Sequence, residues 1–151
     1  MPLMEVFHAH TVADVALLAK RIVASLEVSA APGHVALSGD LGAGKTTLTQ
    51  AIARELGVAE VVTSPTFVVL KQYETAGSRF AKLVHIDAYR IENEAELGVL
   101  HVRDILDNPL NLVVVEWPEK VPTYTSDSTI QIHGTVADDG GRNFEIMKGT
   151  I

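Results

Sequence analysis

The stretch GDLGAGKT, residues 39–46, matches the P-loop pattern, in which two glycines at fixed spacing precede a lysine and a hydroxyl residue. Glycine allows positive φ angles, so successive N–H groups of such a loop can turn inward and form an anion-binding nest. Lys45 adds positive charge for the β- and γ-phosphates, and the Thr46 hydroxyl is placed to bind Mg²⁺. The stretch therefore predicts a nucleotide phosphate site.

The segments on either side of this loop have the patterns that a P-loop requires. Residues 34–38 (HVALS) form a short apolar run typical of a strand, and residues 45–56 show helical periodicity that ends at Gly57. The N-terminus of that helix would point its partial positive charge at a bound phosphate. A glycine-rich turn that matched the pattern by chance would not be expected to have a strand before it and a helix after it.

The rest of the chain predicts one α/β domain over residues 1–151, because this length leaves no room for two full-sized cores. Thr11 and Asp14 indicate the start of an amphipathic helix that continues to about Glu27, and the apolar run at 111–115 indicates a strand buried on both faces. We expect a three-layer P-loop NTPase-like sheet with parallel central strands and antiparallel hairpin additions. The remaining predicted elements are an edge strand at 4–8, a hairpin of 66–74 and 79–87, a helix at 92–100 and a hairpin of 129–136 and 143–148.

Composition and charge exclude several classes of protein. With 12 basic and 19 acidic residues the formal net charge is −7, which disfavours tight binding of RNA or DNA by this chain alone. The chain has no cysteine, so thiol nucleophiles, disulfides and cysteine-bound metals are ruled out, and its six histidines contain no i, i+4 pair that would propose a zinc site. The start of the chain does not resemble a signal peptide and no apolar stretch could cross a bilayer, so we expect a soluble cytoplasmic protein without membrane contact.

Two acidic residues at predicted strand ends could complete the phosphate site. Glu116 follows the apolar residues 112–115, and Asp87 follows the less uniform residues 83–86. A P-loop enzyme needs such an acid to hold Mg²⁺ or to orient the attacking water, and the sequence leaves open which of the two does which. Each could also be an acid that merely begins a loop. His85, inside an apolar strand, is interpreted as structural rather than as a general base.

The segment 62–67 contains Thr66 shortly after the P-loop helix. In P-loop switch proteins a threonine in such a segment closes over Mg²⁺ and the γ-phosphate, and Pro65 would stiffen the approach to it. An ordinary capped turn rich in Ser, Thr and Pro is the alternative.

Two other functions share this fold. A small-molecule kinase would need an arginine-rich lid over the transferred phosphoryl group, and the chain has no such insertion. A GTP-dependent switch would need a guanine-reading Asn-Lys-x-Asp sequence, and none occurs. The patterns therefore favour a Mg²⁺-dependent ATPase.

With these motifs assembled, the chain resembles the TsaE family (also called YjeE), the small bacterial P-loop ATPases needed for the threonylcarbamoyladenosine (t6A) modification of tRNA. The matching stretches are GDLGAGKTT (39–47), SPTF (64–67) with Tyr73, HIDAYR (85–90) and EWP (116–118). Their order and spacing, rather than any one of the later motifs, carry the resemblance. Ala88 stands where family members commonly have a bulkier apolar residue, which concerns packing and not chemistry.

The resemblance implies an ATPase that acts with the partner proteins TsaD and TsaB, hydrolysing ATP to drive or reset their assembly rather than acting on tRNA directly. No obvious arginine finger lies near the switch segment, so we expect slow turnover alone and stimulation by partners. The resemblance implies that the catalytic residues are Lys45, Glu116, Asp87 and Thr66. The metal-binding candidates are Thr46, Glu116 and Asp87. The implied nucleotide-binding set is Thr11, Gly39, Asp40, Leu41, Gly42, Ala43, Gly44, Lys45, Thr46, Thr47, Trp117 and Arg142.

Overall fold

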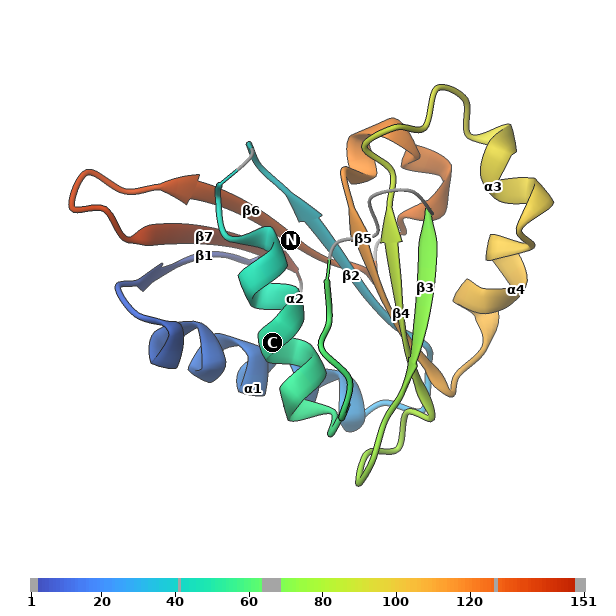
Figure 1. The fold of residues 1–151 in the computed structure, drawn as a ribbon, viewed down its shortest axis with the longest axis horizontal. Helices are drawn as coiled ribbons and strands as arrows, with labels where there is room; N and C mark the ends of the chain where they lie inside the picture. The colour runs from blue at the N-terminus through green and yellow to red at the C-terminus, as the bar shows by residue number, and fades with distance from the viewer. Residues whose placement is uncertain (1–2, 41, 64–68, 127, 149–151) are drawn as a thin grey trace.

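The computed structural model describes residues 3–40, 42–63, 69–126 and 128–148, and the strands of this part of the chain form one seven-stranded sheet (Figure 1). The strand order is β1-β7-β6-β2-β5-β4-β3. The strands are β1 (Leu3–Ala9), β2 (Gly33–Ser38), β3 (Leu70–Glu74), β4 (Lys82–Asp87), β5 (Asn111–Glu116), β6 (Ile130–Val136) and β7 (Arg142–Lys148).

The centre of the sheet is parallel and its edges are antiparallel, as expected. β2 pairs with β5 and β6 in parallel, and β4 pairs with β5 in parallel, whereas β3, β7 and β1 are added antiparallel. All six residues of β5 are buried, which explains the continuous apolar run of that strand. Because the carboxyl ends of parallel strands meet at one edge, Ser38, Asp87 and Glu116 end their strands at the same edge of the sheet.

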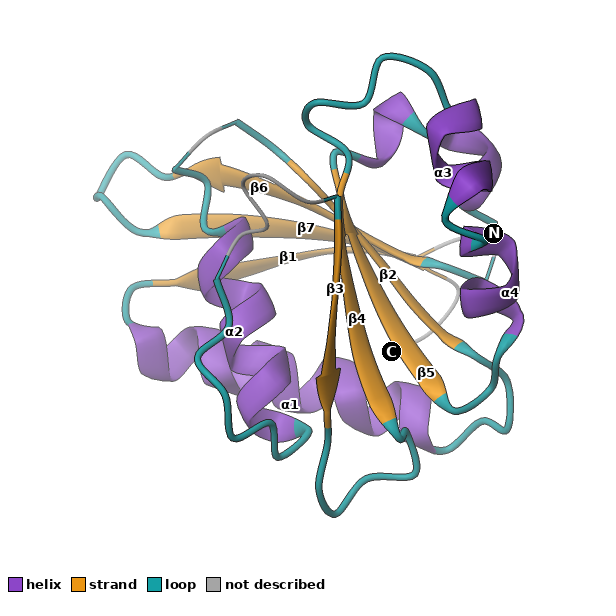
Figure 2. Cartoon of the chain, turned by 45° about the vertical axis from the view of Figure 1, so that its right-hand side comes forward, coloured by secondary structure: helices purple, strands orange, loops and turns teal. Residues whose placement is uncertain are grey.

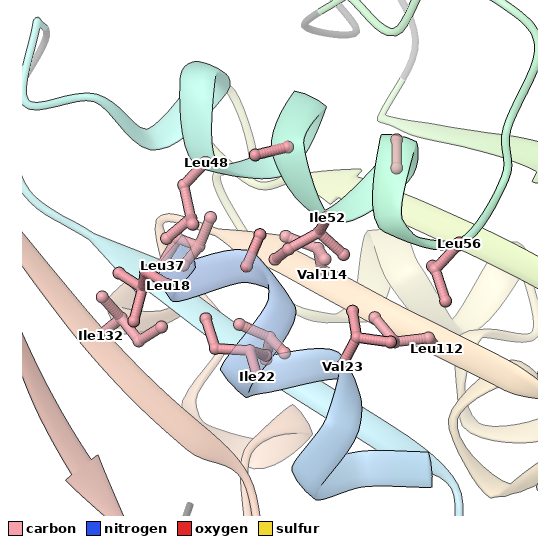
Figure 3. Close-up of a cluster of buried hydrophobic side chains, with 14 of the residues drawn as sticks. Leu18, Ile22, Val23, Leu37, Leu48, Ile52, Leu56, Leu112, Val114 and Ile132 are labelled. Carbon is pink, nitrogen blue, oxygen red and sulfur yellow. The ribbon is translucent and has the colours of Figure 1, made fainter. Parts of the chain in front are cut away.

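Helices cover both faces of the sheet and make the fold a three-layer α/β structure. The helices α1 (Val12–Glu27) and α2 (Lys45–Glu55) lie on one face, and α3 (Ala95–Val99) and α4 (Val102–Asp107) lie on the other (Figure 2). The apolar positions of α1 recur at helical spacing and are buried against α2 and the sheet (Figure 3). A separate apolar cluster lies under α3, α4 and the 3₁₀ turns Pro118–Lys120 and Pro122–Tyr124.

Three predicted elements differ from the observed ones. The strand predicted at 79–87 begins only at Lys82 as β4, because the Arg79 guanidinium bonds the carbonyls of Leu26, Ala31 and Pro109 and anchors the loop before it. In the strand predicted at 66–74, Val69 is not part of β3, which begins at Leu70. The predicted helix at 92–100 starts only at Ala95, since the Glu96 carboxylate accepts the N–H groups of residues 92 and 93. The short helix α4 is not predicted; it follows His101, whose φ of 53° breaks the chain direction. The first three residues of the predicted strand at 66–74 lie outside the described residues.

Within the described part of the chain, no helix combines the length and the apolar character that a membrane span needs.

Candidate nucleotide-binding site

A cleft of about 800 Å³ opens at the carboxyl edge of the parallel strands. The P-loop and the start of α2 form one side of it, and the ends of β4 and β5 form another. The turn between β1 and α1 and the β6–β7 hairpin close one end. In open α/β sheets this edge is where ligands bind, so the cleft lies where the topology predicts it.

The P-loop is held in shape by close packing against the β6–β7 hairpin. Gly39 has a φ of 127°, and a Cβ atom there would lie 2.3 Å from the carbonyl oxygen of Gly134 in β6. Gly44, with a φ of 97°, lies directly before the first residue of α2 and would bring a Cβ atom to 3.2 Å from Phe144. The positive φ favours glycine at both positions, and at Gly39 the space available also requires it.

Lys45 is buried beneath the loop, with its ammonium group next to an aromatic ring. Its Nζ donates to the carbonyl of Gly39 and lies 3.9 Å from the centroid of the Trp117 ring. An ammonium group has three N–H donors, so it can bond an anion in the cleft while it keeps the bond to Gly39. The side chain is positioned to place its charge at the base of the loop.

Trp117 adopts an unusual backbone conformation to reach this position. Its φ is 58°, its N–H donates to Leu37 at 3.1 Å, and its ring packs on Tyr89 with centroids 5.0 Å apart. A bulky residue at positive φ is a strained conformation of the kind that clusters at functional sites. The strain supports a role for this ring at the cleft.

The two acidic residues lie side by side, because β4 and β5 place Asp87 and Glu116 at paired positions. Asp87 is half-buried and accepts the N–H of Tyr89 at 2.9 Å. Burial, and to a lesser extent the charge of Glu116, raise the pKa of the Asp87 carboxyl above its ordinary value. This end of the sheet therefore holds two carboxyl groups close together, one of them with a stronger affinity for a proton than an exposed Asp.

Glu116 is 3% exposed, and His85 is its hydrogen-bond partner. The Nε2 atom of His85 lies 2.5 Å from the Glu116 carboxylate. A carboxylate accepts and an imidazole N–H donates, so Nε2 carries the hydrogen and fixes the orientation of the acid. The structural interpretation of His85 was incomplete, because this fully buried ring also holds a candidate site residue.

Most of the predicted site residues line this cleft. They are Thr11, Gly42, Gly44, Lys45, Thr46, Thr47, Asp87, Glu116, Trp117 and Arg142. Gly39, Asp40 and Ala43 belong to the loop but do not line the cleft; Asp40 is exposed and Ala43 is buried beneath the loop. Leu41 and Thr66 lie outside the described residues.

Two predicted contact residues have structural partners of their own. The Thr11 hydroxyl accepts the Asp14 N–H at 3.2 Å and caps α1, while the Asp14 carboxylate accepts the Thr11 N–H at 3.1 Å. Arg142 donates from Nε to the carbonyl of Gly42 at 2.8 Å and from Nη1 to the carbonyl of Gly140 at 2.9 Å. Arg142 thus ties the β6–β7 hairpin to the P-loop.

The residues present fit a hard divalent cation such as Mg²⁺. The Thr46 hydroxyl and the carboxylates of Asp87 and Glu116 face one cleft and supply only oxygen, which is the ligand type that Mg²⁺ prefers. The sequence patterns did not indicate that Gly134 and Phe144 pack against the loop, or that His85 bonds Glu116. His85 could have been found from strand alternation, since it lies two residues before Asp87 and so shares a face with it.

Comparison with known proteins gives the family. The model of "Threonylcarbamoyl adenosine biosynthesis protein TsaE" matches residues 9–144. The chain is 37% identical over 123 residues to the tRNA threonylcarbamoyladenosine biosynthesis protein TsaE of Nostoc, which covers 80% of this chain and 73% of the relative. It is 35% identical over 116 residues to the protein of the same name in Haemophilus influenzae, covering 77% and 70%.

A solved structure shares the fold. The crystal structure of YdiB from Bacillus subtilis is similar with a TM-score of 0.68 and 23% identity, covering 98% of this chain and 87% of that one. The match supports the three-layer architecture described above. On the family match and the curated relatives, the chain belongs to the TsaE family of t6A biosynthesis proteins.

Proposed function

We propose that this TsaE family member is a Mg²⁺-dependent ATPase whose turnover serves the t6A modification of tRNA. The proposal rests on one observation: a single cleft beside a glycine-rich loop is lined by Lys45, Thr46, Asp87 and Glu116. This is the set of groups that phosphoryl transfer needs, which are a phosphate cradle, a cation, a metal site and an acid near the attacking water.

Each group has a role that follows from its position. The loop N–H groups and the N-terminus of α2 bind the phosphates, and Lys45 neutralises their charge. Thr46 and Glu116 would hold Mg²⁺, which neutralises charge on the β- and γ-phosphates when bound. Asp87 lines the same cleft and would orient the water, since a carboxyl with a raised pKa accepts a proton more readily.

The partners we propose are the proteins TsaD and TsaB, with ATP hydrolysis driving or resetting their complex. Among the described residues that line the cleft, the arginines are Arg90 and Arg142, and Arg142 is bonded to backbone carbonyls. An arginine supplied by a partner accelerates related enzymes by about 10³–10⁵-fold. Slow turnover alone and stimulation by the partners are the expected behaviour, and the net charge of −7 fits a subunit that does not bind tRNA tightly by itself.

The test is phosphate release from Mg-ATP by the full chain, alone and with TsaD and TsaB. We expect slow release that the partners accelerate, and its loss in Glu116→Ala with ATP binding largely intact. Lys45→Ala should instead weaken ATP binding. Rapid hydrolysis that partners do not change, preferential use of GTP, or transfer of phosphate to a metabolite would contradict the proposal.

A further inference from the structure

Three side chains outside the proposed catalytic groups form a compact cluster at one end of the sheet. His8 lies in β1, His10 follows that strand, and Asp139 lies in the turn between β6 and β7. The Oδ2 atom of Asp139 lies 3.0 Å from His8 Nε2 and 3.2 Å from His10 Nδ1. One potential ligand atom from each residue lies within 4.8 Å of the others.

The outer hydrogen bonds of the cluster fix which atoms face its centre. His8 Nδ1 bonds the Asn143 side-chain oxygen, which only accepts, so Nδ1 carries the hydrogen. The other Asp139 oxygen, Oδ1, accepts the N–H of Gly141 at 2.9 Å. In a neutral His8 ring the Nε2 lone pair therefore faces the lone pairs of Asp139 Oδ2, and either a shared proton or a metal ion between the two atoms removes this repulsion.

His10 adds a second ring nitrogen to the same carboxylate oxygen. Its ring lies edge-on to His8 with centroids 4.2 Å apart. The three ligand atoms lie close enough together for one divalent ion to bond all of them. Ligand atoms around a tetrahedral ion with bonds of about 2.1 Å are about 3.4 Å apart, close to the two distances to Asp139.

We propose that His8, His10 and Asp139 bind a late first-row divalent transition metal ion of the zinc class. Imidazole nitrogen with one carboxylate suits Zn²⁺ and its neighbours, whereas Mg²⁺ prefers a set made only of oxygen. Asn143 and Gly141 supply the outer bonds that orient metal ligands in proteins. The histidine spacing did not predict this site, because the two histidines are only two residues apart at the end of β1 and the acid lies about 130 residues away.

The bound ion would join the end of β1 to the β6–β7 turn. His10, Gly140 and Gly141 also line the nucleotide cleft, so the ion would hold one end of that cleft in place. The proposal goes beyond the ATPase function and does not depend on it, since no residue of the P-loop and neither Asp87 nor Glu116 takes part.

The experiment is calorimetric titration of the full chain, without a histidine tag, with Zn²⁺ in excess Mg²⁺ and at a pH above the ordinary histidine range. Mg²⁺ occupies sites made of oxygen, and the high pH removes the proton as the competing cation. We expect about one Zn²⁺ per chain and a higher melting temperature with the ion. The matched control is His101→Asn, which removes an exposed histidine that lies outside the cluster.

The variants His8→Ala, His10→Ala and Asp139→Asn should each weaken Zn²⁺ binding by at least tenfold, and Asn143→Ala by about tenfold. Circular dichroism checks that each variant is folded. If His8→Ala does not fold, His10→Ala, at an exposed residue, gives the same test. Absence of Zn²⁺ binding by the wild-type chain would overturn the proposal. So would equal binding by wild type and the three ligand variants, which would reduce the cluster to ion pairs, or an equal loss in His101→Asn.

Discussion

The P-loop and the carboxylate pair lie at the same cleft, but the fold holds them in different ways. The loop depends on backbone shape and close packing, as between Gly39 and Gly134. The acids depend on burial and on side-chain hydrogen bonds, above all the bond of His85 to Glu116. Substitutions in the loop should therefore be harmful when the new side chain has no space. Substitutions around the acids should be harmful when they leave a buried polar group without a hydrogen-bond partner.

The largest effect on stability is expected from His85→Ala. The change leaves the Glu116 carboxylate buried without its donor and should lower the free energy of unfolding by about 3 kcal/mol. Urea unfolding measures this effect. His34→Ala is the matched control, because His34 bonds the Leu106 carbonyl at 2.6 Å near the opposite end of the sheet. Both changes should cost stability, but only His85→Ala should also reduce Mg-ATP hydrolysis; equal hydrolysis in the two variants would contradict the role of His85.

Gly39→Ala tests the packing of the loop. Its Cβ atom would overlap the Gly134 carbonyl, so we expect a loss of about 2 kcal/mol and a strong loss of nucleotide binding. Gly77→Ala is the control, since Gly77 has a φ of 79° and no atom within 4 Å of an added Cβ. The control should cost about 1 kcal/mol from backbone strain alone and leave nucleotide binding unchanged. Equal nucleotide affinity in the two variants would show that contact with β6 does not shape the loop.

Arg142→Ala should show how far the hairpin supports the loop. The change removes the bonds to Gly42 and Gly140 and should cost about 1.5 kcal/mol, together with weaker ATP binding. Arg21→Ala removes a surface ion pair with Glu5 and should cost less than 1 kcal/mol. Thermal unfolding and ATP titration of both variants measure the difference. Unchanged ATP affinity in Arg142→Ala would mean that the loop keeps its shape without this arginine.

The smallest effect is expected from Thr11→Ala, which removes the N-cap of α1. A loss of about 1 kcal/mol follows from the missing bond to Asp14, and Thr11→Ser should restore most of it. If Thr11 also contacts the nucleotide, the Ala variant should lose ATP affinity beyond what its stability explains. Chemical unfolding of the two variants measures the capping role of Thr11, and ATP titration measures its contact with the nucleotide. A Ser variant as unstable as the Ala variant would refute the capping role.

Local patterns predicted much of the fold and of the cleft. The P-loop, the buried strand ending in Glu116 and the capped helix after Thr11 each rest on neighbouring residues, so a short window of sequence suffices to find them. The same holds for Asp87, whose place beside Glu116 follows once two parallel strands end at one edge.

The contacts that sequence could not supply join distant segments. Gly134 and Arg142 lie about 100 residues from the loop that they support. No local pattern marks Gly134, and the resemblance implied Arg142 as a nucleotide contact rather than as a support of the loop. The late start of the strand predicted at residues 79–87 likewise depends on Arg79 reaching three carbonyls in other segments. The His8, His10 and Asp139 cluster exists only because β1 and β7 pair.

The most direct test of the central claim is calorimetric titration of the folded chain with Mg-ATP. The loop and Lys45 should bind the triphosphate, and the facing acids should hold its magnesium ion. Heat of binding is therefore expected for wild type, with lower affinity for Lys45→Ala and retained binding for Glu116→Ala. Absence of heat with Mg-ATP and Mg-GTP at millimolar concentration, not restored by TsaD and TsaB, would contradict it.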